Sequence, residues 1–218
     1  MNDFLELITQ WLDDSEKFIE RSIGGLKRAL YGAEKELLSQ ILTELVPKLE
    51  YRNEALVAND RNMARLQILD RVMDRFAGST GRGLTERFAS ELMEVAGRAP
   101  EYYVLAGFDQ DKVNRVAEDT ALMRRTIGID ERGGILKGGY LDRLAGAAEV
   151  RETVLNYIVS SMASKRGPSD FVDGLRGLIQ GVDGDNGVLR SHWERYAFDS
   201  YSQVREIQNL HMANELRL

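Results

Sequence analysis

The amino-acid sequence predicts an all-α protein, a multi-helix bundle of long amphipathic helices in two subregions joined by a Gly-rich hinge. Apolar residues recur at three- and four-residue steps along most of the chain, which is the period of one helix face. Proline is scarce, with 3 residues in 218, and no alternating run of β-branched residues favours a strand. We therefore expect more than about 60% helix, against the usual third, and no sheet of three or more strands.

The N-terminal helical region is predicted to cover residues 1–128. Its first apolar face begins at Leu5 and continues at helical spacing to Leu30. We expect a bend or break at Gly24-Gly25, because glycine in a helix costs about 1 kcal/mol relative to alanine. Gly32 is the expected end of this helix.

Further apolar stretches at helical spacing follow in this region, at residues 38–49, 56–76, 84–95 and 113–123. Pro47 is expected to kink the first of these stretches, because proline removes a helix hydrogen bond. Segment 78–83, which is rich in glycine, is predicted to be a loop before the third stretch. Asp109 is the expected N-cap of the fourth stretch, and Gly128 its end.

Segment 129–139 is the most glycine-rich part of the chain and is the predicted hinge. It leads into the C-terminal helical region, residues 140–218. There, Gly167-Pro168 should end one helix and begin the next, since glycine suits a left-handed cap and proline has its φ already set. The last helix is expected from about Val188 to about Asn214. Its predicted buried face comprises Leu189, Trp193, Tyr196, Ala197, Ser200, Val204, Ile207 and His211.

Composition excludes several classes of function. The formal net charge of −6 disfavours a protein that grips bare nucleic acid, so DNA contact would need a local basic patch. The absence of cysteine rules out thiolate zinc sites, and His192 and His211 are too few for a histidine-based site. No signal-peptide pattern and no apolar run of roughly 18 residues is present, so no membrane-spanning segment is expected. We expect no bound metal, no cofactor and no catalytic activity.

The turn after residue 182 has some of the ligands of a calcium-binding EF-hand loop. Asp183, Asp185 and Glu194 match the first, third and twelfth positions of such a loop. The fifth and sixth positions are Gly187 and Val188, so the fifth ligand and the glycine bend are missing. Asp, Asn and Gly favour tight turns by themselves, and an ordinary turn is the preferred interpretation.

Three other groups of residues could in principle bind a ligand or serve catalysis. Gly133-Gly134 and Gly138-Gly139 could cradle a phosphate, but the P-loop order of Lys followed by Ser or Thr is absent. The carboxylates of Glu118 and Asp119 could serve an enzyme, but no catalytic motif accompanies them. Arg124-Arg125, flanked by acidic residues, is interpreted as a solvated face rather than a nucleic-acid patch.

The aromatic residues of the last helix are the candidate protein interface. Trp193 and Tyr196 lie on its predicted core face, whereas Phe198 and Tyr201 lie off that face. Aromatic side chains pack cores and also anchor interfaces, and core packing is the more frequent case. The hypothesis is that Trp193 and Tyr196 hold the helix in place while Phe198 and Tyr201 contact a partner.

The C-terminal part of the chain resembles a known family. The residues that carry the resemblance are the helix Val150–Ile158, the break Gly167–Phe171, the turn Asp185–Leu189, the aromatic segment Tyr196–Gln203 and the ending Met212–Leu216. This pattern of helices and breaks is similar to the Mu-F-like head-morphogenesis proteins, the minor head proteins of tailed phages, in the divergent form found in Bacteroidetes phages and prophages. The resemblance covers roughly residues 120–218. Family members commonly continue into a short β-rich region, whereas this chain stops at Leu218.

The resemblance implies a low-copy virion component that is assembled in the host cytoplasm and associated with the portal or inner capsid. The expected partner is the portal or capsid protein, or a second copy of the chain, contacted through helices. The alternative from another class is a bacterial helical adaptor or regulatory binding module. Portal and major capsid genes beside the gene for this chain would favour the first interpretation.

Overall fold

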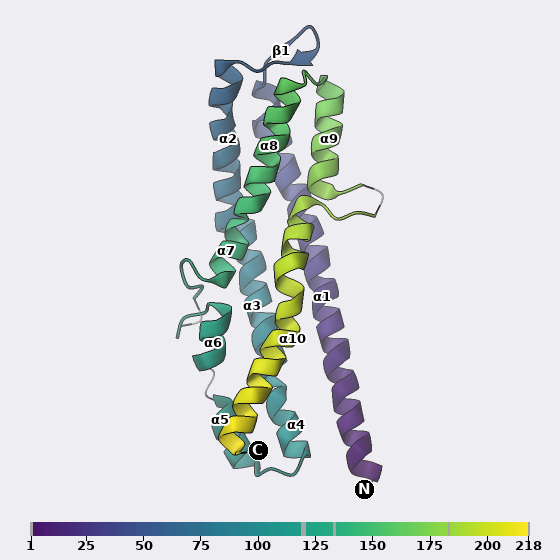
Figure 1. Cartoon of the computed structure of the whole chain (residues 1–218), viewed down its shortest axis with the longest axis vertical. Coiled ribbons are helices and arrows are strands. Elements are labelled where there is room, and N and C mark those ends of the chain that lie inside the picture. The colour runs from purple at the N-terminus through teal and green to yellow at the C-terminus, as the bar shows by residue number, and fades with distance from the viewer. Residues whose placement is uncertain (1, 119–120, 133, 183, 218) are drawn as a thin grey trace. The chain divides into compact units, whose positions relative to one another are not determined.

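The computed structural model describes residues 2–118, 121–132, 134–182 and 184–217. It is 81% helical, which confirms the all-α prediction, and the sheet in its described residues has two short strands. The α-helices, labelled in Figure 1 where there is room, are α1 (Asn2–Glu44), α2 (Asp60–Phe76), α3 (Arg82–Gly97), α4 (Ala99–Leu105), α5 (Gln110–Glu118), α6 (Ala121–Ile127), α7 (Tyr140–Gly146), α8 (Ala148–Ala163), α9 (Pro168–Gln180) and α10 (Val188–Leu216). A 3-10 turn (Val46–Lys48), the strands β1 (Tyr51–Arg52) and β2 (Ala55–Leu56), and a π-helical turn (Ala77–Gly81) complete the described elements.

The chain forms two compact units, each assembled from segments that are distant in the sequence. The terminal unit comprises Met1–Leu26, Thr85–Asp142 and Tyr196–Leu218, and the hairpin unit comprises Lys27–Leu84 and Arg143–Arg195. These units divide the chain differently from the predicted regions 1–128 and 140–218. The difference arises because α1, α3, α7 and α10 each contribute residues to both units.

Helix α1 passes through the glycines at which the sequence predicted a break. It continues without interruption from Asn2 to Glu44, across Gly24-Gly25 and Gly32. Leu26, Leu30, Leu37 and Ile41 of this helix are fully buried. Burying one such side chain contributes about 1.5–3 kcal/mol, which outweighs the roughly 1 kcal/mol that each glycine costs.

The predicted loop at residues 78–83 is also helical. The chain passes from α2 through the π-helical turn Ala77–Gly81 directly into α3. A Cβ at Gly81 would lie 2.7 Å from the carbonyl oxygen of Ala145, so glycine permits the close approach of these two backbones. Here glycine marks close packing within a continuous helical segment rather than a loop.

The hairpin unit takes its name from the turn between α1 and α2. Strands β1 and β2 pair through a two-residue turn at Asn53-Glu54, whose φ values are +50° and +57°. Positive φ at both central residues suits the twist of a two-residue hairpin. Asn62 of α2, fully buried, closes the base of the hairpin: its side chain accepts from the Glu50 N–H at 2.8 Å and donates to the carbonyls of Glu50 and Val57 at 3.0 and 2.8 Å.

The predicted break at Gly167-Pro168 is confirmed. Gly167 is the N-cap of α9 and Pro168 its first residue, and Gly181, with φ of +80°, ends it. The hydroxyl of Tyr157 on α8 donates to the Phe171 carbonyl at 2.8 Å, and the two rings stack with centroids 5.8 Å apart. These contacts hold α9 against α8.

A buried carboxylate fastens the start of α10 to α1 within the hairpin unit. Glu34 has no exposed surface; it accepts from the backbone N–H of Arg190 at 3.0 Å and from its Nε at 2.7 Å. Burial raises the pKa of Glu34, while the hydrogen bonds and charge of Arg190 lower it, and the net direction is upward. The carboxylate therefore stabilises the first turn of α10 as an N-cap does, but from a distant part of the sequence.

The terminal unit packs around residues of α3, α4, α5 and α10. Tyr103, Val113, Met212 and Leu216 form one buried apolar cluster in it. The Tyr103 hydroxyl donates to the carbonyl of Asn209 at 2.8 Å. Asp109 caps α5 as predicted, accepting from the Lys112 N–H at 2.9 Å.

Candidate functional site

The first turns of α1 carry three exposed leucines of the terminal unit. Leu5, Leu7 and Leu12 are 59%, 50% and 44% exposed. The helix forms here because its apolar residues keep helical spacing, but the rest of the described chain covers only part of that apolar surface. Leucines left in water are unfavourable by about 25 cal/mol per Å² of apolar area, and contact with a partner removes that penalty.

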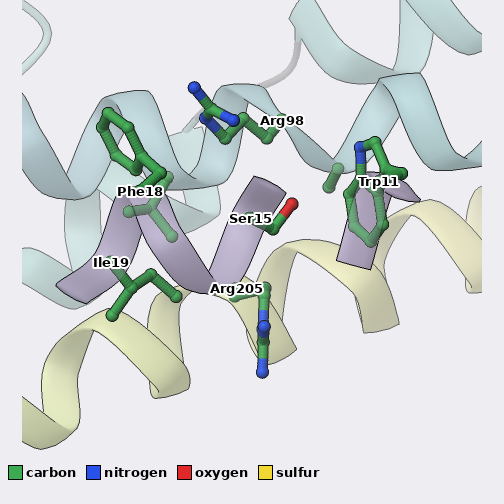
Figure 2. Close-up of a pocket in the computed structure, with 8 residues that line it drawn as sticks. Trp11, Ser15, Phe18, Ile19, Arg98 and Arg205 are labelled. Carbon is green, nitrogen blue, oxygen red and sulfur yellow. The ribbon is translucent and has the colours of Figure 1, made fainter. Parts of the chain in front are cut away.

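Between the exposed leucines, the side of α1 that packs on the terminal unit contacts aromatic and cationic side chains. The rings of Trp11 and Tyr102 lie 5.3 Å apart, and the guanidinium of Arg98 lies 4.2 Å from the centre of the Phe18 ring. Figure 2 shows Trp11, Ser15 and Phe18 following one another along α1, with Arg98 close to Phe18 and the Arg205 side chain of α10 directed away from them. These contacts orient the first turns of α1 on the terminal unit, so the exposed leucines are presented on a supported helix.

The cavity between these side chains is too small to bind a substrate. Its volume is about 10 Å³, and its lining consists of Trp11, Ser15, Phe18, Ile19, Val95, Arg98, Ala99 and Arg205. A space of this size holds at most about one water molecule. The arrangement therefore suits packing and surface contact rather than small-molecule chemistry.

The structure corrects the predicted burial of two aromatic residues on α10. Tyr201, expected off the core face, is fully buried, whereas Tyr196, expected on that face, is 38% exposed. Trp193 is buried as predicted, and Phe198 is half-buried. The buried stripe of α10 comprises Leu189, Trp193, Ala197, Tyr201, Val204, Gln208, Met212 and Leu216. Three- and four-residue steps starting at Trp193 reach Tyr201 as readily as Ser200, and both side chains are buried.

Tyr201 is held in the terminal unit by both its ring and its hydroxyl. The ring meets Phe88 edge-on at 5.4 Å between centroids, and the hydroxyl donates to Oε2 of Glu91 at 2.6 Å. Burial, with the Glu91 carboxylate beside it, raises the pKa of Tyr201 far above its ordinary value. The hydroxyl therefore stays protonated and acts as a permanent donor. Because this side chain has no exposed surface, it is a core residue and not an accessible anchor for a partner.

The candidate sites for chemistry are occupied by internal contacts where the structure describes them. Asp183 and Asp119 lie outside the described residues. Glu194, the last ligand of the proposed calcium loop, pairs with Lys27 at 3.2 Å and accepts from the side-chain amide of Asn186. Within the described part of the chain, no cluster of three or more His, Cys, Asp or Glu residues could hold a metal ion.

The glycines of the predicted hinge do not present free amides to a phosphate. The Gly134 N–H donates to Oδ1 of Asp130 at 2.7 Å, and the Gly138 N–H donates to Oδ2 of Asp142 at 2.7 Å. A single antiparallel bridge joins Ile129 and Ile135. Carboxylates of the chain thus occupy the positions that a phosphate would need.

The two histidines belong to different units. His192 is buried in the hairpin unit, with Nδ1 3.5 Å from Oε2 of Glu149, whereas His211 is half-buried in the terminal unit. Burial lowers the pKa of His192, although Glu149 raises it in part. Glu118 is exposed.

A comparison with known protein families, with characterised proteins and with solved structures finds no match. Among the described residues, no helix combines the length and apolar character needed to cross a bilayer. We take the three exposed leucines of α1 as the candidate binding site, because burying them against a partner would be favourable. We call Leu5, Leu7 and Leu12 the leucine surface. Reasoning from the sequence assigned Leu5 and Leu12 to a helix face without identifying them as an interface.

Proposed function

We propose that this protein is a structural component of a phage head, a minor head or portal-associated protein that acts by helix-mediated contacts with other proteins. The single observation that carries the binding role is the leucine surface, with side chains 44–59% exposed on a helix that packs well elsewhere. The resemblance of residues 120–218 to the Mu-F-like head-morphogenesis proteins supports the assignment to a virion. The portal or capsid protein is the partner that this assignment implies.

The proposal fits the chemistry of the chain. A net charge of −6 is suited to contact with proteins rather than to wrapping the packaged DNA.

Co-purification with the neighbouring gene products tests the proposal. The full chain is co-expressed with the portal protein encoded beside its gene, and the mixture is separated by size. Co-elution of the two proteins, reproduced after mixing them in purified form, is the expected result. The helical adaptor would be favoured instead if no portal and capsid genes lie beside the gene, or if the portal protein does not bind the chain.

A further inference from the structure

We propose that the side of the leucine surface formed by Leu5 and Leu12 docks into an apolar groove of the partner whose rim carries Lys and Arg. This inference rests on the function proposed above and specifies both the contact surface on this chain and the chemistry of the surface that receives it. Helix-in-groove binding is a recurrent mode of protein recognition, in which residues at helical spacing act as anchors.

The exposed leucines lie on both sides of the line along which α1 packs. Ser15 and Ser22 are buried and mark that line. Leu5 and Leu12 are seven residues apart, about two helical turns, so they share one side of it. Leu7 falls on the other side. The apolar arc at the start of α1 is thus wider than the part its own unit covers, which is the pattern of a helix that packs against two bodies.

The polar side of this helical segment is acidic, and two of its carboxylates, Glu16 and Glu20, lie beside Leu5 and Leu12. All of the following are exposed: Glu6, Asp13, Asp14, Glu16 and Glu20. Lys17 is the only basic residue between positions 5 and 20, so this short segment accounts for much of the net charge of −6. Glu16 and Glu20 lie beside the Leu5–Leu12 side, and Asp14 lies beside Leu7 at about 100° per residue.

The acidic side chains determine which kind of binding partner is favourable at this surface. A symmetric pairing of two α1 surfaces would bring the same acidic residues together, and like charges in an interface are unfavourable. An anionic lipid surface would meet the same repulsion. A partner with cations at the rim of its groove gains from Glu16 and Glu20, the carboxylates beside Leu5 and Leu12.

The size of the surface leads to the same conclusion. A standard interface needs about 800 Å² on each partner, more than three leucine side chains supply. The partner must therefore also cover the neighbouring polar residues of the helix, and those residues are predominantly carboxylates. Rim charges of this kind set orientation and association rate, while the buried leucines supply most of the affinity.

The experiment measures binding of full-length variants to the purified portal protein encoded beside the gene, at low and high salt. The leucine variant is Leu5→Ser with Leu12→Ser, and the charge variant is Glu16→Gln with Glu20→Gln. Their matched controls are Leu210→Ser, at an exposed leucine of α10 in the same unit, and Glu215→Gln, at an exposed glutamate of that helix. Since every substituted side chain is exposed, all variants should keep the circular dichroism spectrum of the wild type.

We expect the leucine variant to bind at least about tenfold more weakly, as loss of two anchors from an interface requires. The charge variant should bind more weakly at low salt and respond less to added salt. Both controls should bind as the wild type does. If the portal protein binds the wild type and all variants equally, the inference is wrong while the proposed function stands. If the portal protein does not bind the wild type, both fall.

Two further measurements test whether a second copy of the chain or a lipid surface binds the leucine surface instead. A concentration-dependent dimer of the wild type in sedimentation, abolished in the leucine variant, would assign the surface to a second copy and overturn the proposal. Binding of the wild type to phosphatidylglycerol vesicles that the leucine variant loses would assign it to a lipid surface and overturn it equally. We expect the wild type to be monomeric in sedimentation and not to bind the vesicles.

Discussion

Removing the hydroxyl of Tyr201 tests whether this residue belongs to the core of the terminal unit. In Tyr201→Phe the ring and its edge-on contact with Phe88 remain, and only the hydrogen bond to Glu91 is lost. The acceptor is a charged carboxylate 2.6 Å away. Hydrogen bonds to charged groups contribute about 1.5–3 kcal/mol. We expect the free energy of unfolding to fall by about 2 kcal/mol, a value within that range.

The assay is urea unfolding followed by the helical circular dichroism signal, with Tyr196→Phe as the matched control. Tyr196 is on the same helix and 38% exposed, so losing its hydroxyl should change stability by less than about 0.5 kcal/mol. A double-mutant cycle with Glu91→Gln isolates the contact, and a coupling energy above about 1 kcal/mol is expected. Equal stability of Tyr201→Phe and the wild type would refute the reasoning.

The burial of Tyr201 also changes the result expected for the double substitution Phe198→Ser with Tyr201→Ser. On the hypothesis that both rings face a partner, it should abolish assembly and leave the helix content intact. Removing a buried aromatic ring costs about 3–5 kcal/mol, a large part of the stability of an ordinary domain. We expect this variant to lose helix content, so an assembly defect in it would report on the core rather than on an interface.

Three other perturbations test contacts within the hairpin unit. Asn62→Ala, which removes the three hydrogen bonds at the hairpin base, should lower the free energy of unfolding in urea by about 3 kcal/mol; a loss below 1 kcal/mol would contradict this. Glu34→Ala leaves a partly buried guanidinium without its partner and should cost about 3–5 kcal/mol, whereas the exposed Glu36→Ala should cost less than about 0.5 kcal/mol. His192 has a lowered pKa in the folded protein, so its contribution to stability is present above its ordinary pKa and is lost as pH falls below that value. Unfolding at pH 7.5 to 5 should show this loss, and His192→Gln should flatten it; an unchanged pH dependence in that variant would contradict the assignment to His192.

The extent of helix could be predicted because periodicity is a local property of the sequence. The boundaries at Gly167-Pro168 and the cap at Asp109 were predicted correctly for the same reason, since caps depend on neighbouring residues. The breaks expected at Gly24-Gly25 and in segment 78–83 were wrong, because packing from distant segments decides whether a glycine ends a helix. The hairpin was missed because two-residue strands carry too little alternation to be recognised.

The grouping into units could not be predicted either, because it depends on contacts between distant segments. Glu34 and Arg190 are an example. Neither belongs to a local motif, and they are 156 residues apart in the sequence, yet their contact caps the first turn of α10. Buried polar contacts of this kind depend on three-dimensional neighbours. A sequence that specifies each helix well can therefore leave the assembly of those helices undetermined.

The leucine surface shows the same limit at the candidate site. Leu12 and Leu26 belong to one periodic apolar pattern on α1, yet Leu26 is fully buried and Leu12 is 44% exposed. Periodicity identifies which side of a helix is apolar and gives no information on what covers it. Charge adds the missing distinction: the first turns of α1 combine apolar side chains with an excess of carboxylates, whereas Leu26 is followed directly by Lys27 and Arg28. An apolar helix side bordered by carboxylates is the pattern expected of a surface completed by a partner of opposite charge.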